Sequence, residues 1–562
     1  MKRLEYALSA LAWFIALAIA GASLFAMFRF THVMPFADQW DLTARLFTVD
    51  GPGGFWEVLW RPHNVHRLVL FNILNATDFW FFSASNSFNI VALACTAIAS
   101  AVVFVLVLRA AGVERRSLAL WAAPAAIAAI FNGAQSECLT WPLGLQWFLV
   151  NLFFLCAVLA MLSAAKAEAG KRSFAMAACI LASIAASLSS GNGLLVWPVL
   201  VLLAIALRLK PLRIAGYAAA GAAVIALYLP GLRPADLPLS STSLLDLLAY
   251  TARFIGNVWY WADFPFQGDL FASVSGYLVV TGAVALGVLL ACRRLGRPQQ
   301  ALAAIVIFSV ATGFLASTGR IGHGISQGYA PRYATAGGML WAALLAWLAV
   351  QSAPIWAKRP AGVLAVRVAL LFWALIALLA YQPRMLSTVA EWYALRERGA
   401  LAIMTNVHDD RLTTPVYLES GQLFKHVDAF RARGISIFAE PRSRYAGKPL
   451  LTLAWPDDTA CTGAAEKLEA FNNENGVPVS YRGYGWIDPP PGQGGAILIA
   501  NRQGQVIGLG SAVAEARFPW DAPSPTRWFA VVRPGADAMG VFAIKSTAPA
   551  PGCALGAWIL NP

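Results

Sequence analysis

Hydrophobic runs recur along the first two thirds of the chain, and short polar connections separate them. Each run holds about 20 residues, which is enough for a helix to cross roughly 30 Å of hydrocarbon. The pattern predicts eleven membrane-spanning helices, at approximately 6–28, 87–108, 117–132, 143–164, 174–189, 193–208, 213–230, 270–291, 299–317, 333–351 and 361–381.

The pattern changes after residue 383. A polar helical passage at 391–411 is followed by short alternating runs that Gly, Pro and Asp turns divide, which is typical of antiparallel strands. The predicted strands are 435–438, 450–453, 496–499, 506–509, 528–532 and 540–544. We therefore expect an α-helical polytopic membrane domain of about eleven spans at 1–383, followed by a mainly β, sandwich-like accessory domain at 384–562.

Composition and charge agree with a membrane protein. Hydrophobic residues make up 59% of the chain and charged residues 13%, and the formal net charge is +13. The positive charge gathers at the N-terminus and at every second connection, as the positive-inside rule requires of cytoplasmic loops, so it indicates topology and not nucleic-acid binding. These residues are Lys2, Arg3, Arg109, Arg115, Arg116, Lys166, Lys171, Arg172, Arg208, Lys210, Arg213, Arg293, Arg294, Arg297, Lys358 and Arg359.

This topology places the N-terminus in the cytoplasm and the C-terminal domain outside it. The outer connections then carry most of the acidic residues and all four histidines that precede residue 383. Charged groups beside a bilayer are costly and usually functional. We therefore expect any chemistry on the outer side.

The first outer loop, residues 29–86, holds the strongest candidates. Asp38 and Asp41 lie three residues apart, so they share a face at the start of a helix. Either carboxylate could act as a general base or could cap that helix. Asp41 is the better cap, which makes Asp38 the preferred base. Residues 67–80 are predicted to form a helix lying along the membrane interface.

The same loop contains His63, His66 and Arg67. The two histidines, with Asp38 or Asp41, could ligate a divalent metal, although no established zinc spacing is present. They could equally contact a phosphate or lie solvated among lipid headgroups. Arg67 could bind the phosphate of a substrate.

Further candidate substrate-binding residues lie in the later outer connections. Glu137 is in the second, and Arg253 is on an amphipathic helix predicted at 241–259 to lie on the membrane surface. The Gly-rich fifth loop, 317–335, adds two arginines suited to bidentate binding of a phosphate or of a lipid headgroup. Its candidate residues are Arg320, His323, Arg332 and Tyr333.

Only two of the seven cysteines, Cys461 and Cys553, lie in the C-terminal domain. An exported domain permits a disulfide between them. No spacing of Cys and His residues indicates a zinc site.

In layout, residues 1–381 resemble a GT-C-type glycosyltransferase, the group that includes protein O-mannosyltransferases and the aminoarabinose transferase of lipid A. The shared features are a first span, a long outer loop opening with an acidic pair (FADQWD), interfacial helices, further spans and an exported C-terminal domain. The acids are separated here, whereas several relatives have them adjacent. HNVHR and GRIGHG…APRY also resemble stretches of bacterial membrane proteins of this type.

The resemblance implies a polyprenyl-phosphate-linked sugar as donor, a glycan or lipid as acceptor, and an acidic residue of the first outer loop as base or metal ligand. That role falls on Asp38 or Asp41, with arginines stabilising the lipid-phosphate leaving group. No cofactor is certain, and a divalent metal remains an alternative. Two other classes stay open: an O-antigen polymerase or ligase, and a non-enzymatic flippase or transporter of lipid-linked glycans.

Overall fold

The computed structural model of the chain describes residues 2–232, 242–260, 268–352, 361–449, 462–488, 496–512, 526–535, 538–544 and 552–559. Within them the chain forms two compact units. Unit 1 comprises Met1–Arg29, Trp56–Leu74 and Asn89–Leu386, and unit 2 comprises Phe30–Phe55, Asn75–Phe88 and Ser387–Pro562. The acidic segment of the first loop therefore folds with the C-terminal region, whereas the HNVHR segment folds with the helical bundle.

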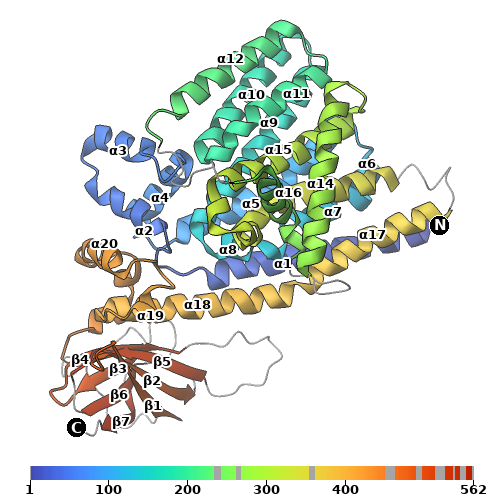
Figure 1. The fold of residues 1–562 in the computed structure, drawn as a ribbon. Coiled ribbons are helices and arrows are strands. Elements are labelled where there is room, and N and C mark those ends of the chain that lie inside the picture. The colour runs from blue at the N-terminus through green and yellow to red at the C-terminus, as the bar shows by residue number, and fades with distance from the viewer. Residues whose placement is uncertain are drawn as a thin grey trace. The chain divides into compact units, whose positions relative to one another are not determined.

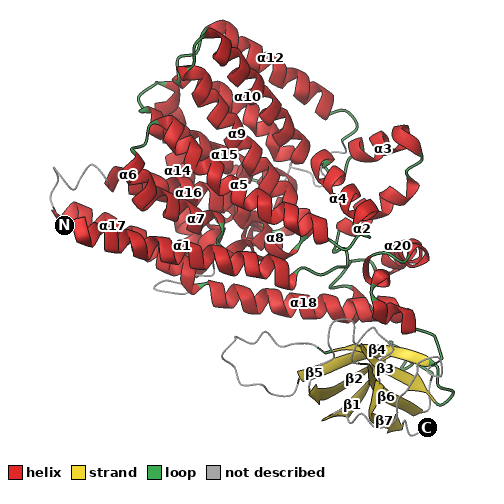
Figure 2. Cartoon of the chain, turned by 180° about the vertical axis from the view of Figure 1, so that it is seen from behind, coloured by secondary structure: helices red, strands yellow, loops and turns green. Residues whose placement is uncertain are grey.

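Unit 1 is a bundle of helices (Figures 1 and 2). Its elements are α1 (Lys2–Phe30), α5 (Ser87–Ala111), α6 (Arg115–Ser117), α7 (Ala123–Ile130), α8 (Ser136–Thr140), α9 (Leu145–Lys166), α10 (Ala169–Ser189), α11 (Val196–Ala206), α12 (Pro211–Tyr228), α13 (Leu244–Gly256), α14 (Gly268–Ala291), α15 (Arg297–Arg320), α16 (Ala334–Ser352) and α17 (Ala361–Ala380). Two helices of the first loop, α3 (Gly51–Trp60) and α4 (Val69–Phe81), belong partly to each unit. The helix predicted at 67–80 is thus confirmed as a helix.

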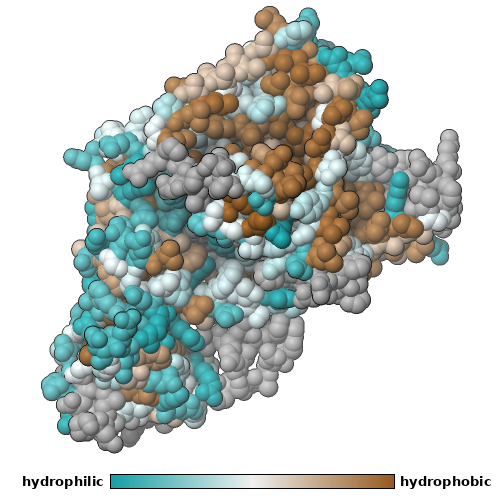
Figure 3. Space-filling model, viewed as in Figure 1, coloured by the Kyte–Doolittle hydropathy of each residue, from teal (hydrophilic) through white to brown (hydrophobic). Residues whose placement is uncertain are grey.

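Ten helices in the described ranges are long and apolar enough to cross a membrane, which is consistent with a multi-pass membrane protein. They overlap ten of the eleven predicted spans. The segment predicted as a span at 193–208 is instead a shorter apolar helix within Gly191–Ala206. Figure 3 shows hydrophobic side chains gathered on the surface of unit 1. Leu227 of α12 and Leu278 of α14 are among those exposed.

The helix predicted to lie on the membrane surface at 241–259 forms as α13, but its surroundings differ from the prediction. It packs against α14, α15 and α16. A Cβ atom added at Gly276 of α14 would lie 1.9 Å from the carbonyl oxygen of Ala252, so α13 and α14 meet backbone to backbone. Tyr250 and Asn257, which the sequence places on the polar face, are buried. Glycine at the crossing allows this approach, and the amphipathic pattern does not reveal it.

Unit 2 combines helices with a β-sheet. Its helical elements are α2 (Gln39–Ala44), η1 (Arg45–Thr48), most of α18 (Gln382–Thr405), α19 (Asp410–Thr413), α20 (Ser420–Arg433), η12 (Ser436–Ala439) and η13 (Pro441–Tyr445). The predicted strand 435–438 is wrong, because this stretch is a 3₁₀ turn. Ser436 has a φ of +57°, which an extended strand does not accommodate.

Within the described residues, seven strands form one antiparallel sheet with the order β1-β2-β5-β4-β3-β6-β7. They are β1 (Thr462–Asn472), β2 (Pro478–Asp488), β3 (Ala496–Asn501), β4 (Val506–Ser511), β5 (Thr526–Val532), β6 (Ala538–Ile544) and β7 (Gly552–Ile559). The end strands β1 and β7 also contact each other, so the sheet curls into a barrel-like form. The predicted mainly β fold is confirmed, but the predicted sandwich is wrong.

The inside of this barrel-like sheet is apolar. Ile497 and Ile499 of β3, Trp528 of β5 and Val541 of β6 belong to one buried cluster. The strands predicted at 496–499, 506–509, 528–532 and 540–544 are confirmed as β3 to β6. The predicted strand 450–453 and Cys461 lie outside the described residues, as does the side chain of Cys553.

A buried carboxylate ties the helical part of unit 2 to its sheet. Asp409 caps α19 by accepting a hydrogen bond from the Arg411 backbone N–H at 3.1 Å. It also accepts from Ser480 Oγ at 2.6 Å and from the Arg482 guanidinium at 3.0 Å, both on β2. Burial tends to raise the pKa of Asp409, but the hydrogen bonds from Ser480 and Arg482 outweigh it, and the pKa lies below its usual value.

Because its folded-state pKa is depressed, Asp409 contributes stability that is present above the unfolded pKa of about 3.9 and lost as pH falls through the folded value. Asp409→Asn is expected to lower the thermal unfolding midpoint at pH 7 and to reduce its dependence on pH between about 5 and 2. Calorimetry of the two proteins over this range measures the effect. Equal pH dependence in both would contradict the role given to Asp409.

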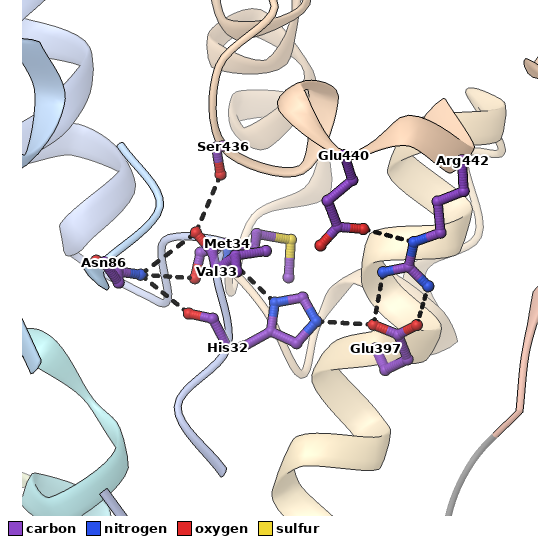
Figure 4. A network of polar contacts seen from close by, with 8 residues as sticks. All are labelled: His32, Val33, Met34, Asn86, Glu397, Ser436, Glu440 and Arg442. Atoms are coloured by element: carbon purple, nitrogen blue, oxygen red, sulfur yellow. Dashed lines mark hydrogen bonds and ion pairs between the residues drawn. The ribbon is translucent and has the colours of Figure 1, made fainter. Parts of the chain in front are cut away.

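A second buried network in unit 2 joins the segment after α1 to α18 and η13 (Figure 4). Both oxygens of the Glu397 carboxylate accept hydrogen bonds from Arg442, which also binds Glu440. His32 Nε2 lies 2.9 Å from Glu397, and His32 Nδ1 accepts the backbone N–H of Met34 at 3.1 Å. Since Nδ1 accepts, Nε2 carries the proton, and His32 donates to Glu397 as a neutral ring.

Candidate functional site

Asp38 and Asp41 open the short helix α2 in unit 2. Asp38 occupies the N-cap position but makes no capping hydrogen bond with its side chain. Asp41 lies in the first turn, and its side chain is 30% exposed. The preference for Asp38 rested on Asp41 being the cap, and the structure gives the cap position to Asp38.

The Asp41 carboxylate is held by two donors from the C-terminal region. The Tyr417 hydroxyl donates to Oδ1 and to Oδ2, each at 3.1 Å. His426 Nε2, on α20, lies 3.0 Å from Oδ1, and because a carboxylate only accepts, the ring is the donor. This is an oriented carboxylate that remains partly open to solvent.

Tyr417 is suited to its role as a donor. Burial, and then the negative charge of Asp41 beside it, raises the pKa of Tyr417 to about 12. The hydroxyl therefore stays protonated at neutral pH and remains a donor to the Asp41 carboxylate.

Hydrophobic packing holds α2 against α20 (Figure 1). Trp40 and Phe430 are fully buried, and their rings pack edge to face with centroids 4.8 Å apart. Phe47 contacts the same Phe430 ring at 5.0 Å. Aromatic packing of this kind fixes the spacing of the two helices, and therefore the distance from His426 to Asp41.

His63 and His66 form a tight hairpin in unit 1. Their backbone N–H and C=O groups exchange two hydrogen bonds, at 2.8 and 3.0 Å, and Asn64 between them has a φ of +51°. Residues paired in this way point to the same side. Burial, and then the positive charges of Arg320 and His63, lowers the pKa of His66 to about 4, so the ring is neutral at physiological pH.

His66 Nδ1 is buried and has no hydrogen-bond partner among the described residues. A Cβ atom at Gly191 would lie 2.6 Å from this nitrogen, so the ring rests against the Gly191 backbone. A neutral ring can still donate to or accept from a substrate, but it adds no charge to a phosphate site.

Arg67 has the contacts of a structural residue. Its guanidinium donates to the backbone carbonyls of Trp60, Tyr228 and Pro230, and it packs 4.7 Å from the centroid of the Trp60 ring. Its side chain is buried. These contacts join the first loop to the end of α12 and use three of the five guanidinium N–H donors, one on each nitrogen, which favours a structural role over the predicted binding role.

The remaining predicted binding residues lie around α13 and the fifth loop in unit 1. Arg332 pairs with Glu137 at 3.0 Å and lies over the Tyr333 ring at 5.3 Å. Arg320 and Arg332 both lie close enough to Tyr250 to interact electrostatically with its hydroxyl. The Gly-rich loop thus gathers two cations beside a buried tyrosine.

Arg253 and His323 are the other two predicted binding residues of this region. Arg253 lies over the ring of Tyr329 at 5.6 Å, and Tyr329 stacks on Tyr260 with centroids 4.1 Å apart. His323 is exposed on the fifth loop.

No group of three or more His, Cys, Asp or Glu side chains within the described ranges is arranged to hold a metal. Asp38 and Asp41 belong to unit 2, whereas His63 and His66 belong to unit 1. The predicted metal site therefore gains no support, and we derive no step through a metal.

Sequence reasoning missed Tyr417 and His426. They are 376 and 385 residues from Asp41 in the chain, and neither occurs in a recognisable motif. His426 and His408 are the only histidines of the C-terminal region. That scarcity was the single available signal.

No family model matches the chain, and searches of curated proteins and of solved structures also return no match. The function is therefore argued from the residues themselves.

Proposed function

We propose that this protein is an integral-membrane glycosyltransferase. It would transfer a sugar from a polyprenyl-phosphate donor to a glycan or lipid acceptor on the outer face of a bacterial cytoplasmic membrane. The observation that carries the proposal is the Asp41 carboxylate, which Tyr417 and His426 orient and which remains partly exposed. The apolar helical bundle supports a lipid-linked substrate, and the resemblance in layout to GT-C-type enzymes supports the reaction class.

The reaction is a displacement with inversion at the anomeric carbon. An acceptor hydroxyl oxygen attacks that carbon, its proton passes to the Asp41 carboxylate, and the bond from carbon to the phosphate oxygen breaks. The electron pair leaves with the polyprenyl phosphate. The resemblance to GT-C-type enzymes assigns that phosphate to arginines, and Arg320 and Arg332 are the candidates, because guanidinium groups bind phosphate oxygens in a bidentate manner.

Transfer by the purified full-length chain in lipid vesicles is the direct test. Synthetic polyprenyl-phosphate mannose and polyprenyl-phosphate aminoarabinose serve as donors, an envelope extract supplies acceptors, and the release of polyprenyl phosphate is measured. Movement of a labelled donor across the vesicle membrane without transfer would contradict the proposal and favour a flippase.

Arg320→Gln is expected to lower kcat/KM for the donor by about 10- to 100-fold, because it removes one or two charge-assisted hydrogen bonds to the phosphate. Arg297→Gln, at the other end of the same helix α15, is the matched control. Equal activity of the two variants would contradict the phosphate role. If Arg320→Gln loses transfer activity while Asp38→Asn and Asp41→Asn keep full activity, the result would favour an O-antigen polymerase or ligase.

A further inference from the structure

We infer that Tyr417 and His426 are positioning residues that hold Asp41 in the orientation required of the proton acceptor. The inference rests on the proposed function and adds to it two residues from the C-terminal region. This region would then be part of the catalytic apparatus and not an accessory to it.

The two donors reach Asp41 from a rigid support. The backbone N–H of Ala37 donates to the carbonyl of Val416 at 2.8 Å, which fixes the segment before α2 beside the residue that precedes Tyr417. On the other side, Phe430 packs on Trp40 one turn beyond His426 along α20. The chain is thus anchored on both sides of the pair of donors, so neither donor can move without disturbing a backbone hydrogen bond or a buried ring.

The hydrogen bonds distinguish the two carboxylate oxygens of Asp41. Among the described residues, Oδ1 accepts from His426 and shares the single Tyr417 O–H with Oδ2, which has no other donor. Each carboxylate oxygen has two lone-pair positions. Oδ2 is therefore the less occupied oxygen and keeps room for a further proton. The geometry assigns Oδ2 as the atom that receives the proton of the acceptor hydroxyl.

Such support matters for an aspartate on a helix as short as α2. A partly exposed side chain samples several rotamers, and ordering it ahead of the reaction removes that cost from the transition state. Neither donor needs to touch the substrate.

The test compares variants that remove a donor with one that retains it. Tyr417→Phe and His426→Phe delete one hydrogen bond each while keeping a ring, and His426→Gln keeps an N–H near the Nε2 position. His408→Phe is the matched control, because the His408 ring stacks on Phe424 of α20 with centroids 3.6 Å apart, and among the described residues the donors to Asp41 are Tyr417 and His426. Steady-state transfer from polyprenyl-phosphate mannose or aminoarabinose gives kcat and KM for each variant.

Tyr417→Phe and His426→Phe are each expected to lower kcat by about 10- to 100-fold with little change in KM, because a base displaced by a fraction of an ångström reacts slowly while the donor still binds. His426→Gln and His408→Phe should stay within about threefold of the unaltered protein. Unfolding midpoints measured on the same preparations separate this effect from a loss of folding.

Two results would overturn the inference alone. One is kcat near that of the unaltered protein in Tyr417→Phe and His426→Phe while Asp41→Asn is inactive. The other is equal loss in His426→Phe and His426→Gln, accompanied by equal falls in unfolding midpoint. Absence of transfer by the unaltered protein, in contrast, would overturn the proposed function and the inference with it.

Discussion

Asp41→Asn is expected to lower the rate of sugar transfer by about 10²- to 10⁴-fold, the usual contribution of a general base. The amide retains the size of the side chain and can still accept hydrogen bonds from Tyr417 and His426 through its oxygen. It cannot take a proton from the acceptor hydroxyl. The rate of polyprenyl-phosphate release under saturating donor measures the loss.

Two matched variants make this result specific. Asp38→Asn changes the neighbouring acid, which lies at the cap position of α2, and should lose less activity than Asp41→Asn. Asp428→Asn changes an exposed aspartate on α20, which pairs with Arg431 on the surface, and should retain full activity. A larger loss in Asp38→Asn than in Asp41→Asn would show that the sequence-based preference for Asp38 was correct.

Glu397→Ala is expected to destabilise unit 2 by about 3–5 kcal/mol, because it leaves the buried Arg442 guanidinium without its main partner and His32 without its acceptor. A change of this size is a large part of the stability of a typical domain. Chemical denaturation followed by tryptophan fluorescence would measure it.

The matched control for this network is an exposed ion pair of the same unit. Glu466 lies 3.1 Å from Arg527, and both side chains are largely exposed. Glu466→Ala should change stability by no more than about 1 kcal/mol, as is usual for exposed pairs. Similar effects of the two substitutions would contradict a structural role for the Glu397 network.

The local pattern of hydrophobic and polar residues predicted those helices and strands whose surroundings stay the same along their whole length. The long apolar runs became α1, α5, α9, α10, α14, α15 and α16, because a run of about 20 apolar residues has few stable alternatives to a helix. The strands β3 to β6 followed from short runs rich in Val, Ile and Trp. The length of the helix predicted at 193–208 was overestimated, because a 3₁₀ turn at Gly191–Leu195 occupies its first residues.

The prediction missed elements whose residue types favour a different secondary structure from the one they adopt in the fold. Strand β1, with the sequence TGAAEKLEAFN, is rich in residues that favour helix. It is extended because it pairs along its whole length with β2, from Thr462 opposite Asp488 to Asn472 opposite Pro478. Strand propensity depends on such neighbours more than on the residue itself. The pairing partner is not visible in the strand's own sequence.

The sequence by itself determined that this chain is a multi-span helical protein with a mainly β C-terminal part, and it marked Asp38 and Asp41 as an unusual pair. It could do so because hydrophobic length and alternation are local properties. Only the tertiary structure decided that Asp41 is held by Tyr417 and His426, that Arg67 binds backbone carbonyls, and that α13 is packed within the bundle. Each of these depends on groups far apart in the chain, which only folding brings within hydrogen-bonding distance.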